Sequence, residues 1–416
     1  MIKDKLKYSL RHNFFLEKEI KKIDAYFKLN TLKETQNQAF LKLIKAAQKT
    51  TFYPKFYKEN GIDIYKISSL DDLPKLPVLT KAMVKTNPKA FLSKKMPIGI
   101  IKGFTSGSTG SPLMVYRDLK AILKENAYVW WYRNNCGLTS KDRKISFRSD
   151  LNRTSLFKFN KAENTLYISP NHLNKENARQ IIDKVKDFAP KALISYPSTA
   201  YNFALLLAKE NTKLKIPLTF TSSENILGFQ REKIEQLLTT TIFDWYGNAE
   251  RTIALYSEND AYYEPPLYAI TEYKQTEVIT TGLINTTFPL IRYQVNDLIE
   301  TTSTYSATKK SVEIKSIVGR LEDAIVLKDG TRINRLNRDF TGIEGLQKAQ
   351  VIQVSLDKLC INLVKEEEAK TIATNILEAK LRKRLGDEVE IEFQVILEKD
   401  LITSASGKYK FVISKI

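Results

Sequence analysis

Helical and strand-like segments alternate in the middle of this chain, and the alternation restricts the possible folds more than any other feature. In chain order the apolar spacing predicts a helix over 176–187, a strand over 192–195, a helix over 199–209, a strand over 218–221, a helix over 229–238 and a strand over 241–245. Such alternation is typical of a parallel sheet with right-handed crossover connections. The sequence therefore predicts an α/β fold.

Short polar clusters follow these strands. They read Ser195-Tyr-Pro-Ser198, Ser222-Ser-Glu-Asn225 and Tyr246-Gly-Asn-Ala-Glu250. Ligands of open α/β sheets bind at the carboxyl ends of the strands, so we expect the clusters to line one crevice. The candidate site residues here are Ser223, Glu224, Tyr246, Gly247 and Glu250. Two structural alternatives stay open at this point, a strand-to-helix cap at Ser223 and a solvated loop acid at Glu250.

A loop rich in Ser, Thr and Gly precedes the alternating region, between an apolar run at 98–101 and a strand-like run at 112–116. Its residues are Thr105, Ser106, Gly107, Ser108, Thr109 and Gly110. Glycines allow the backbone to turn tightly, and hydroxyl and N–H groups can then converge on an oxyanion such as a phosphate chain. The loop lacks the spacing of a Walker loop and of a dinucleotide fold, and a flexible surface loop is the structural alternative.

The flanking regions predict further elements. Residues 8–60 have helical spacing that ends in a loop at 52–57, two prolines within 73–81 predict an extended segment, and Asp118 is placed to cap a helix. Residues 277–300 are rich in strand formers. Beyond residue 318 we expect a hairpin with a turn at 329–330, strands at 351–354 and 360–364, a helix over 366–385 that stops at Gly386, and a strand over 389–396.

Length and composition limit the classes of protein. A chain of 416 residues fits a large and a small domain, which we place at 1–318 and 319–416. No apolar run reaches the ~20 residues that span a bilayer, so we expect a cytoplasmic protein without membrane contact. The cysteines Cys136 and Cys360 are far apart, and with the histidines His12 and His172 they supply neither a disulfide framework nor a zinc cluster.

The formal net charge is +19, from 66 basic and 47 acidic residues. The lysines are scattered over predicted outer helix faces, without a basic stripe interleaved with aromatics, so we expect no nucleic-acid partner. A solvated lysine-rich surface and attraction of anionic substrates are the two readings that remain.

The order of these motifs resembles that of the adenylate-forming enzymes, the superfamily of acyl-CoA synthetases, luciferase and peptide-synthetase adenylation domains. Within it the chain is similar to the phenylacetate-CoA ligase branch, including its capsule-biosynthesis relatives. The resemblance rests on the loop at 105–110, on 246–250, on Pro289-Leu-Ile-Arg-Tyr293 with Asp297, on Gly319-Arg320 with Glu322-Asp323, and on Ser406-Gly-Lys408.

This resemblance implies a reaction and a set of roles. The loop would hold the β- and γ-phosphates of ATP, Glu250 would bind Mg²⁺, and Asp297 would accept both ribose hydroxyls. Ser223, Glu224, Tyr246 and Gly247 would lie against the nucleotide and the acid, and Arg320 would add a nucleotide contact. Lys408, from a small mobile α+β domain hinged at 319–324, would bridge the carboxylate and the α-phosphate as the catalytic lysine.

The implied function is Mg-ATP-dependent activation of a carboxylic acid, with an aryl acid mildly preferred, and transfer of the acyl group to CoA. Transfer to an amine, a sugar or a protein is the first alternative, and a catalytically silent interaction module is the second. The oligomeric state stays open, with a homodimer as one alternative. Ser111, Ala249 and Asn296 depart from the family pattern, and for Arg292 and His172 structural roles compete with binding roles.

Overall fold

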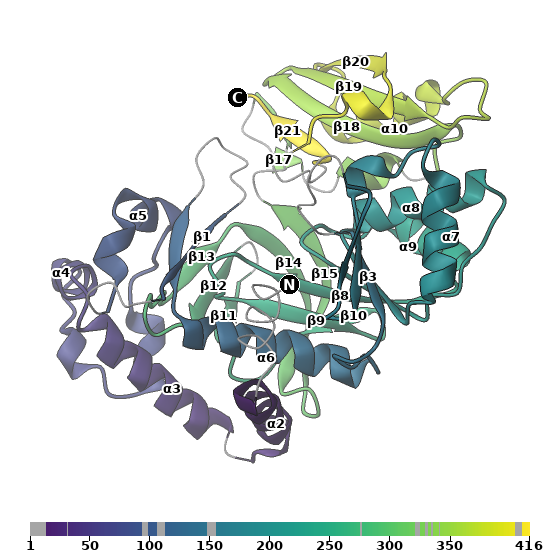
Figure 1. Cartoon of the computed structure of the whole chain (residues 1–416). Coiled ribbons are helices and arrows are strands. Elements are labelled where there is room, and N and C mark those ends of the chain that lie inside the picture. Colours follow the sequence, from purple (N-terminus) through teal and green to yellow (C-terminus); the bar gives the residue numbers. More distant parts are fainter. Residues whose placement is uncertain are drawn as a thin grey trace. The chain divides into compact units, whose positions relative to one another are not determined.

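The computed structural model describes residues 14–30, 32–93, 99–105, 113–147, 155–274, 277–320, 325–328, 332–333, 336–340, 342–403 and 410–416. The chain is a mixed α/β protein that divides into two compact units (Figure 1). The first comprises residues 1–105, 112–295 and 300–316, and the second comprises residues 106–111, 296–299 and 317–416.

A ten-stranded mixed sheet dominates the first unit. In spatial order its strands are β14 (Asp297–Ser306), β15 (Ser311–Arg320), β10 (Ala261–Tyr263), β9 (Ala254–Glu258), β8 (Thr241–Gly247), β7 (Leu218–Ser222), β6 (Ala192–Ser195), β3 (Lys144–Ser146), β5 (Thr165–Ile168) and β4 (Phe157–Asn160). Strands β5, β3, β6, β7 and β8 run parallel, and β9 reverses the direction. The parallel α/β sheet predicted from the alternation is therefore confirmed.

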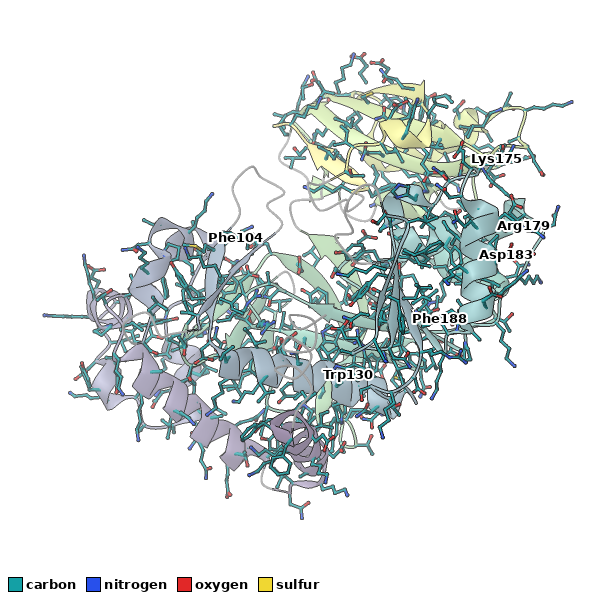
Figure 2. All side chains as sticks on the ribbon, in the orientation of Figure 1. Phe104, Trp130, Lys175, Arg179, Asp183 and Phe188 are labelled. Atoms are coloured by element: carbon teal, nitrogen blue, oxygen red, sulfur yellow. The ribbon has the colours of Figure 1, made fainter. Side chains whose placement is uncertain are left out.

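Three helices alternate with these parallel strands, namely α7 (Ala178–Phe188), α8 (Pro197–Lys209) and α9 (Gly228–Leu238). Their apolar sides share one buried cluster with the sheet, in which Ile181, Phe203 and Ile234 are fully buried. The opposite side of α7 carries charge, and Arg179 and Asp183 project from it one helical turn apart, with 3.5 Å between Nε and Oδ2 (Figure 2). This amphipathic pattern is what made the helices predictable from the sequence.

Helix α6 (Leu119–Asn135), labelled in Figure 1, contributes its two tryptophans to a buried cluster that includes residues of the sheet. Asp118 caps it as predicted, since its carboxylate accepts a hydrogen bond of 2.8 Å from the backbone N–H of Ala121. Trp130 and Trp131 are buried in a cluster with Tyr256 of β9 and Leu16 of α2.

The N-terminal part of the chain is helical, with α2 (Phe14–Lys28), α3 (Leu32–Ala47), α4 (Tyr53–Glu59) and α5 (Lys81–Thr86). The prediction of a loop at 52–57 is wrong, because α4 includes residues 53–57. Pro54 lies in the first turn, where a helix needs no N–H from it, and Tyr53 and Tyr57 are fully buried one turn apart. The segment at 73–81 is extended only from Leu76 onward, since a 3₁₀ helix spans Leu70–Lys75.

Two small antiparallel sheets complete the first unit. One pairs β1 (Ile101–Phe104) with β2 (Met114–Arg117), and the other contains β11 (Ala269–Tyr273), β12 (Val278–Gly282) and β13 (Tyr293–Val295). The strand-rich character expected for 277–300 is present, although 283–292 contains no helix or strand.

The second unit contains a four-stranded sheet in the order β20 (Glu390–Val395), β19 (Lys358–Lys365), β18 (Leu346–Ser355) and β21 (Val412–Ser414). Helix α10 (Thr374–Leu385) covers it through the buried side chains of Leu377, Leu381 and Leu385. The short strands β16 (Ile325–Val326) and β17 (Arg332–Ile333) form the predicted hairpin pair, whose turn at 329–330 lies outside the described residues.

The helix predicted over 366–385 begins later than expected, at Thr374. Tertiary hydrogen bonds hold the preceding segment against the loop before β18, since Glu366 N–H donates to Gly345 at 2.9 Å and Ala373 N–H donates to Glu344 at 3.0 Å. The predicted end of the helix is confirmed, since α10 ends at Leu385 and Gly386 follows it with a φ of +78°.

Candidate functional site

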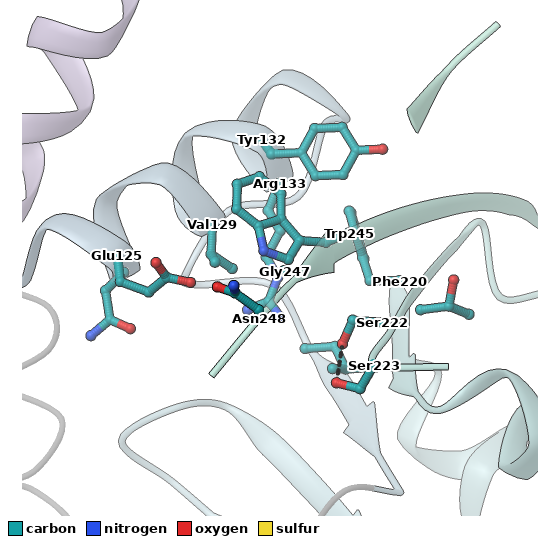
Figure 3. A pocket seen from close by; sticks show the side chains of 13 residues that line it. Glu125, Val129, Tyr132, Arg133, Phe220, Ser222, Ser223, Trp245, Gly247 and Asn248 are labelled. Carbon is teal, nitrogen blue, oxygen red and sulfur yellow. Dashed lines mark hydrogen bonds between the residues drawn. The ribbon is translucent and has the colours of Figure 1, made fainter. Parts of the chain in front are cut away.

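A cavity of about 270 Å³ opens at the carboxyl ends of β7 and β8 (Figure 3). Its lining residues are Glu125, Asn126, Val129, Tyr132, Arg133, Ile194, Phe220, Thr221, Ser222, Ser223, Trp245, Gly247 and Asn248. Helix α6 supplies one wall, and the strand ends supply the other. The second and third polar clusters therefore meet at one cavity, as the position of strand ends in an α/β sheet led us to expect.

The second cluster has an unusual backbone. Ser223 adopts a φ of +73°, which is uncommon for a residue with a side chain. Its hydroxyl lies 3.4 Å from that of Ser222, and the dashed line in Figure 3 marks this contact. Helix α9 begins at Gly228 after Leu227, so Ser223 does not cap it.

Glu224 connects the second cluster to the first. Its Oε2 accepts a hydrogen bond of 3.0 Å from the backbone N–H of Ser198, at the start of α8. A carboxylate at a helix N-terminus is favourable because the unpaired N–H groups there carry partial positive charge. The first cluster therefore holds the second in place through this hydrogen bond. Ile194, the residue before the first cluster, lines the cavity.

The third cluster follows β8. Tyr246 and Gly247 are the last residues of β8, and Asn248 begins the turn that follows. The side-chain amide of Asn248 donates to the hydroxyl of Thr252 at 2.8 Å, and the side-chain oxygen of Asn248 accepts from the N–H of Thr252 at 2.9 Å. Glu250 is 9% exposed, and the hydroxyl of Tyr293 donates to its Oε1 at 2.8 Å. The solvated-acid alternative for Glu250 is thus wrong: the carboxylate is buried and held in place.

Glu250 offers a carboxylate, the kind of oxygen ligand that Mg²⁺ prefers. Among the described residues no three acidic, histidine or cysteine side chains converge into a metal cage. Mg²⁺ at nucleotide sites is commonly held by one or two carboxylates together with phosphate oxygens and water, so a single oriented carboxylate suits an ion that arrives with ATP.

The base of the Ser/Thr/Gly loop is described, and the loop itself is not. Thr105 donates its N–H to the carbonyl of Leu113 at 3.0 Å, and its hydroxyl accepts from the N–H of Leu113 at 2.9 Å. These two bonds close the loop at its base. Ser106, Gly107, Ser108, Thr109, Gly110 and Ser111 lie outside the described residues.

The remaining predicted residues belong to the second unit. Asp297 is the first residue of β14. Arg320 is the last residue of β15, and its side chain is outside the described part of the structure. Lys408 and Glu322 are also outside the described ranges.

The side chains of Arg292 and His172 both have hydrogen-bond partners within the protein. The guanidinium of Arg292 is buried and forms a bidentate ion pair with Glu272, with both N···O distances at 2.8 Å, and it also donates to the carbonyls of Pro74 and Leu76. His172 places Nδ1 2.9 Å from the hydroxyl of Ser169.

Arg117 of β2 was not among the residues predicted from the sequence. Its guanidinium donates to the carbonyl of Ala249, the residue before Glu250. Burial lowers the pKa of Arg117 to about 10, the nearby charge of Arg251 acts in the same direction, and Glu125 and Glu250 oppose it. The only feature of the sequence that could have indicated Arg117 as a site residue is its basic side chain in a short strand beside the Ser/Thr/Gly loop.

Comparisons with known proteins concern the second unit and the fold of the whole chain. Residues 325–415 match the CapK C-terminal domain family. Over 437 aligned residues the chain is 25% identical to Protein CapK of Staphylococcus aureus, which covers 100% of this chain and 96% of that protein.

Among solved structures, the chain matches a 2-hydroxyisobutyryl-CoA ligase in the postadenylation state, in complex with R3-HIB-AMP. The TM-score is 0.68 and the sequence identity is 16%, over 91% of this chain and 89% of that chain. The chain has the adenylate-forming fold. The anthranilate CoA ligase AuaEII in complex with anthranoyl-AMP shares this fold, with a TM-score of 0.54 and 13% identity over 74% of this chain and 64% of that one. The resemblance expected from the motifs is therefore confirmed at the level of fold.

Among the residues that the structure describes, no helix combines the length and the apolar character needed to cross a bilayer.

Proposed function

We propose that this protein is an ATP-dependent ligase that activates a carboxylic acid as an acyl-adenylate. The observation that carries the proposal is the position of two polar clusters after the neighbouring parallel strands β7 and β8. Ser223 and Asn248 line one cavity, and Glu250 lies two residues after Asn248, in a chain with the adenylate-forming fold. A carboxylate oxygen of the acid attacks the α-phosphorus of ATP, the bond to the β-phosphate breaks, and pyrophosphate leaves.

The residues divide this task by charge. Both reactants are anionic, so the site must neutralise charge and hold them in line. In the proposed roles, residues 105–110 bind the β- and γ-phosphates, Asp297 accepts the ribose hydroxyls, and Arg320 contacts the nucleotide. Lys408 places an ammonium between the carboxylate and the α-phosphate. Mg²⁺, held by Glu250, would neutralise the phosphate oxygens when it is bound.

The cavity at the ends of β7 and β8 is proposed to hold the acid. Phe220 and Trp245 give it aromatic walls, and its volume of about 270 Å³ suits a small acid. An aryl acid remains the mild preference because of the similarity to the phenylacetate-CoA ligase branch.

CoA is the leading acyl acceptor. Its thiol would attack the acyl carbonyl, with release of AMP and formation of a thioester. A second candidate is transfer to an amine, a sugar or a protein in surface polysaccharide or related biosynthesis, which the matches to CapK and to its C-terminal domain favour.

The test is an acid-dependent pyrophosphate-exchange screen, followed by mass spectrometry of the products with and without CoA. Lys408→Ala should lower the exchange rate ~10²–10³-fold, because a donor to the developing charge is lost. Lys410→Ala, in the same tail, is the matched control and should retain exchange.

Each alternative has its own outcome. Absence of exchange across a broad acid panel would favour an interaction module without catalysis. Affinity for DNA that persists at moderate salt and is unaffected by Asp297→Ala would favour a nucleic-acid binder instead.

A further inference from the structure

Arg117 lies across the hairpin that carries the Ser/Thr/Gly loop. It pairs with Ile101 in the ladder between β1 and β2, and its guanidinium reaches diagonally over Gly103. A Cβ atom at Gly103 would come within 2.5 Å of Cζ and 2.6 Å of Nη2 of Arg117. A side chain at 103 would have to displace the guanidinium, so glycine at 103 is what allows the guanidinium to lie there.

The same guanidinium contacts the segment that carries the proposed magnesium ligand. It donates to the carbonyl of Ala249, so it joins two segments that are 132 residues apart in the sequence. Its Nε is buried and has no hydrogen-bond partner among the described residues. A buried donor without a partner is costly to maintain, which argues that its orientation is determined by more than packing.

The charges around Arg117 are mixed. Glu125 and Glu250 act on it as negative neighbours and Arg251 as a positive one. Arg251 is itself held by Glu125, at 3.9 Å, and by the carbonyl of Ala121, at 3.3 Å. Arg117 is therefore a fixed positive charge close to Glu250, on an element that leads directly out of the loop.

We propose that Arg117 is a positioning residue of the nucleotide site, which holds the Glu250 segment against the loop-bearing hairpin and supplies fixed positive charge there. The inference rests on the proposed function. A guanidinium clamped between Gly103 and Ala249 is preorganised, so no ordering is needed when the phosphates bind.

The first measurement is binding of Mg·ATP without turnover, by titration of a fluorescent ATP analogue at a series of Mg²⁺ concentrations. Arg117→Gln and Arg117→Lys should weaken binding ~10–100-fold, as expected for loss of a charged hydrogen bond. The Mg²⁺ concentration at half-saturation should rise as well. A purely structural role would lower thermal stability and leave this concentration unchanged.

The second measurement is a double-mutant cycle with Gly103→Ala. The added methyl should displace the guanidinium and reproduce the Arg117 phenotype in the otherwise unaltered protein. In an Arg117→Ala background the same substitution should have no further effect on binding, because its target is gone. Gly228→Ala is the matched control, since a Cβ there meets no atom within 4 Å.

The outcomes separate the two proposals. If the unaltered protein binds no Mg·ATP and exchanges no pyrophosphate with any acid, the proposed function fails and this role fails with it. If the unaltered protein binds Mg·ATP and the folded Arg117 variants bind it equally well, only the role of Arg117 is overturned. Equal effects of Gly103→Ala in both backgrounds would also overturn it.

Discussion

Buried charged groups divide into two kinds at the scale of single residues. Arg292 lies in a motif that resembles a binding segment, yet every described contact of its guanidinium is internal, to Glu272 and to two backbone carbonyls. Glu250 is equally buried but lies in the connection that follows a cavity-lining strand, and a tyrosine hydroxyl orients it. Burial alone therefore does not distinguish a site residue from a core residue in this chain.

Glu264 provides a prediction at this scale. Burial raises the pKa of its carboxyl from the usual 4.5 to about 7, against the opposing hydrogen bond of 2.7 Å from the hydroxyl of Thr271. Between pH 4.5 and 7 the unfolded chain releases this proton while the folded chain keeps it, so stability falls as pH rises through that window. Glu264→Gln should therefore raise the free energy of unfolding by about 1–3 kcal/mol at pH 8 and change it little near pH 4.5.

Tryptophan fluorescence can follow this unfolding in urea. The chain has three tryptophans, Trp130, Trp131 and Trp245, and all lie in the first unit together with Glu264. Glu176→Gln, at an exposed acid of the same unit, is the control and should change the free energy of unfolding by a similar small amount at both pH values. An equal gain for Glu264→Gln at both pH values would contradict the assigned cause.

At the scale of elements, the connection from β7 to α9 combines strain with a place on the cavity wall. Ser223 holds a left-handed backbone conformation that costs on the order of 1 kcal/mol for a residue other than glycine. The neighbouring connection after β8 is closed by side-chain hydrogen bonds and carries Glu250. Local strain next to a supported turn is typical of a site built for binding.

Ser223→Gly should therefore raise the unfolding midpoint of the first unit, because glycine adopts this conformation without strain. It should also lower the rate of acid-dependent pyrophosphate exchange, since the hydroxyl and the fixed backbone are both lost. Ser223→Ala separates the two effects, because it removes the hydroxyl and keeps the strain. A loss of stability in the glycine variant would show that the left-handed conformation is not a source of strain.

At the scale of the whole molecule, the chain consists of two compact units, each with its own buried core. The second unit has a separate apolar cluster formed by α10 and its sheet, and the CapK C-terminal match falls within it. Units of this kind permit a hinge transition between two packed states, which we propose for residues 319–324.

Glu322 is the proposed pivot of this hinge. Glu322→Pro should leave acyl-AMP formation intact and block acyl transfer, because proline fixes the backbone angle that the second half-reaction must change. Single-turnover formation of acyl-AMP and of the CoA product, measured separately, tests this expectation, with Glu322→Ala as the control. Equal loss of both half-reactions would contradict the hinge.

Local sequence patterns were enough to predict most of the fold. The parallel strands β6, β7 and β8 and the helices between them were predictable because their apolar spacing is repeated and their ends are marked by polar residues. The resemblance to adenylate-forming enzymes was likewise readable, since short motifs in a fixed order do not depend on distant contacts.

Tertiary structure decided what depends on residues far apart in the sequence. Helix α4 forms despite Pro54 because Tyr53 is buried and bonds to Pro289 and Ile291, more than 200 residues away. The contact of Arg117 with Gly103 and Ala249, the ion pair of Arg292 and the hydrogen bond from Tyr293 to Glu250 follow from the same cause. The sequence by itself determined the elements and the candidate residues, and only packing determined which side chains support the site and which support the core.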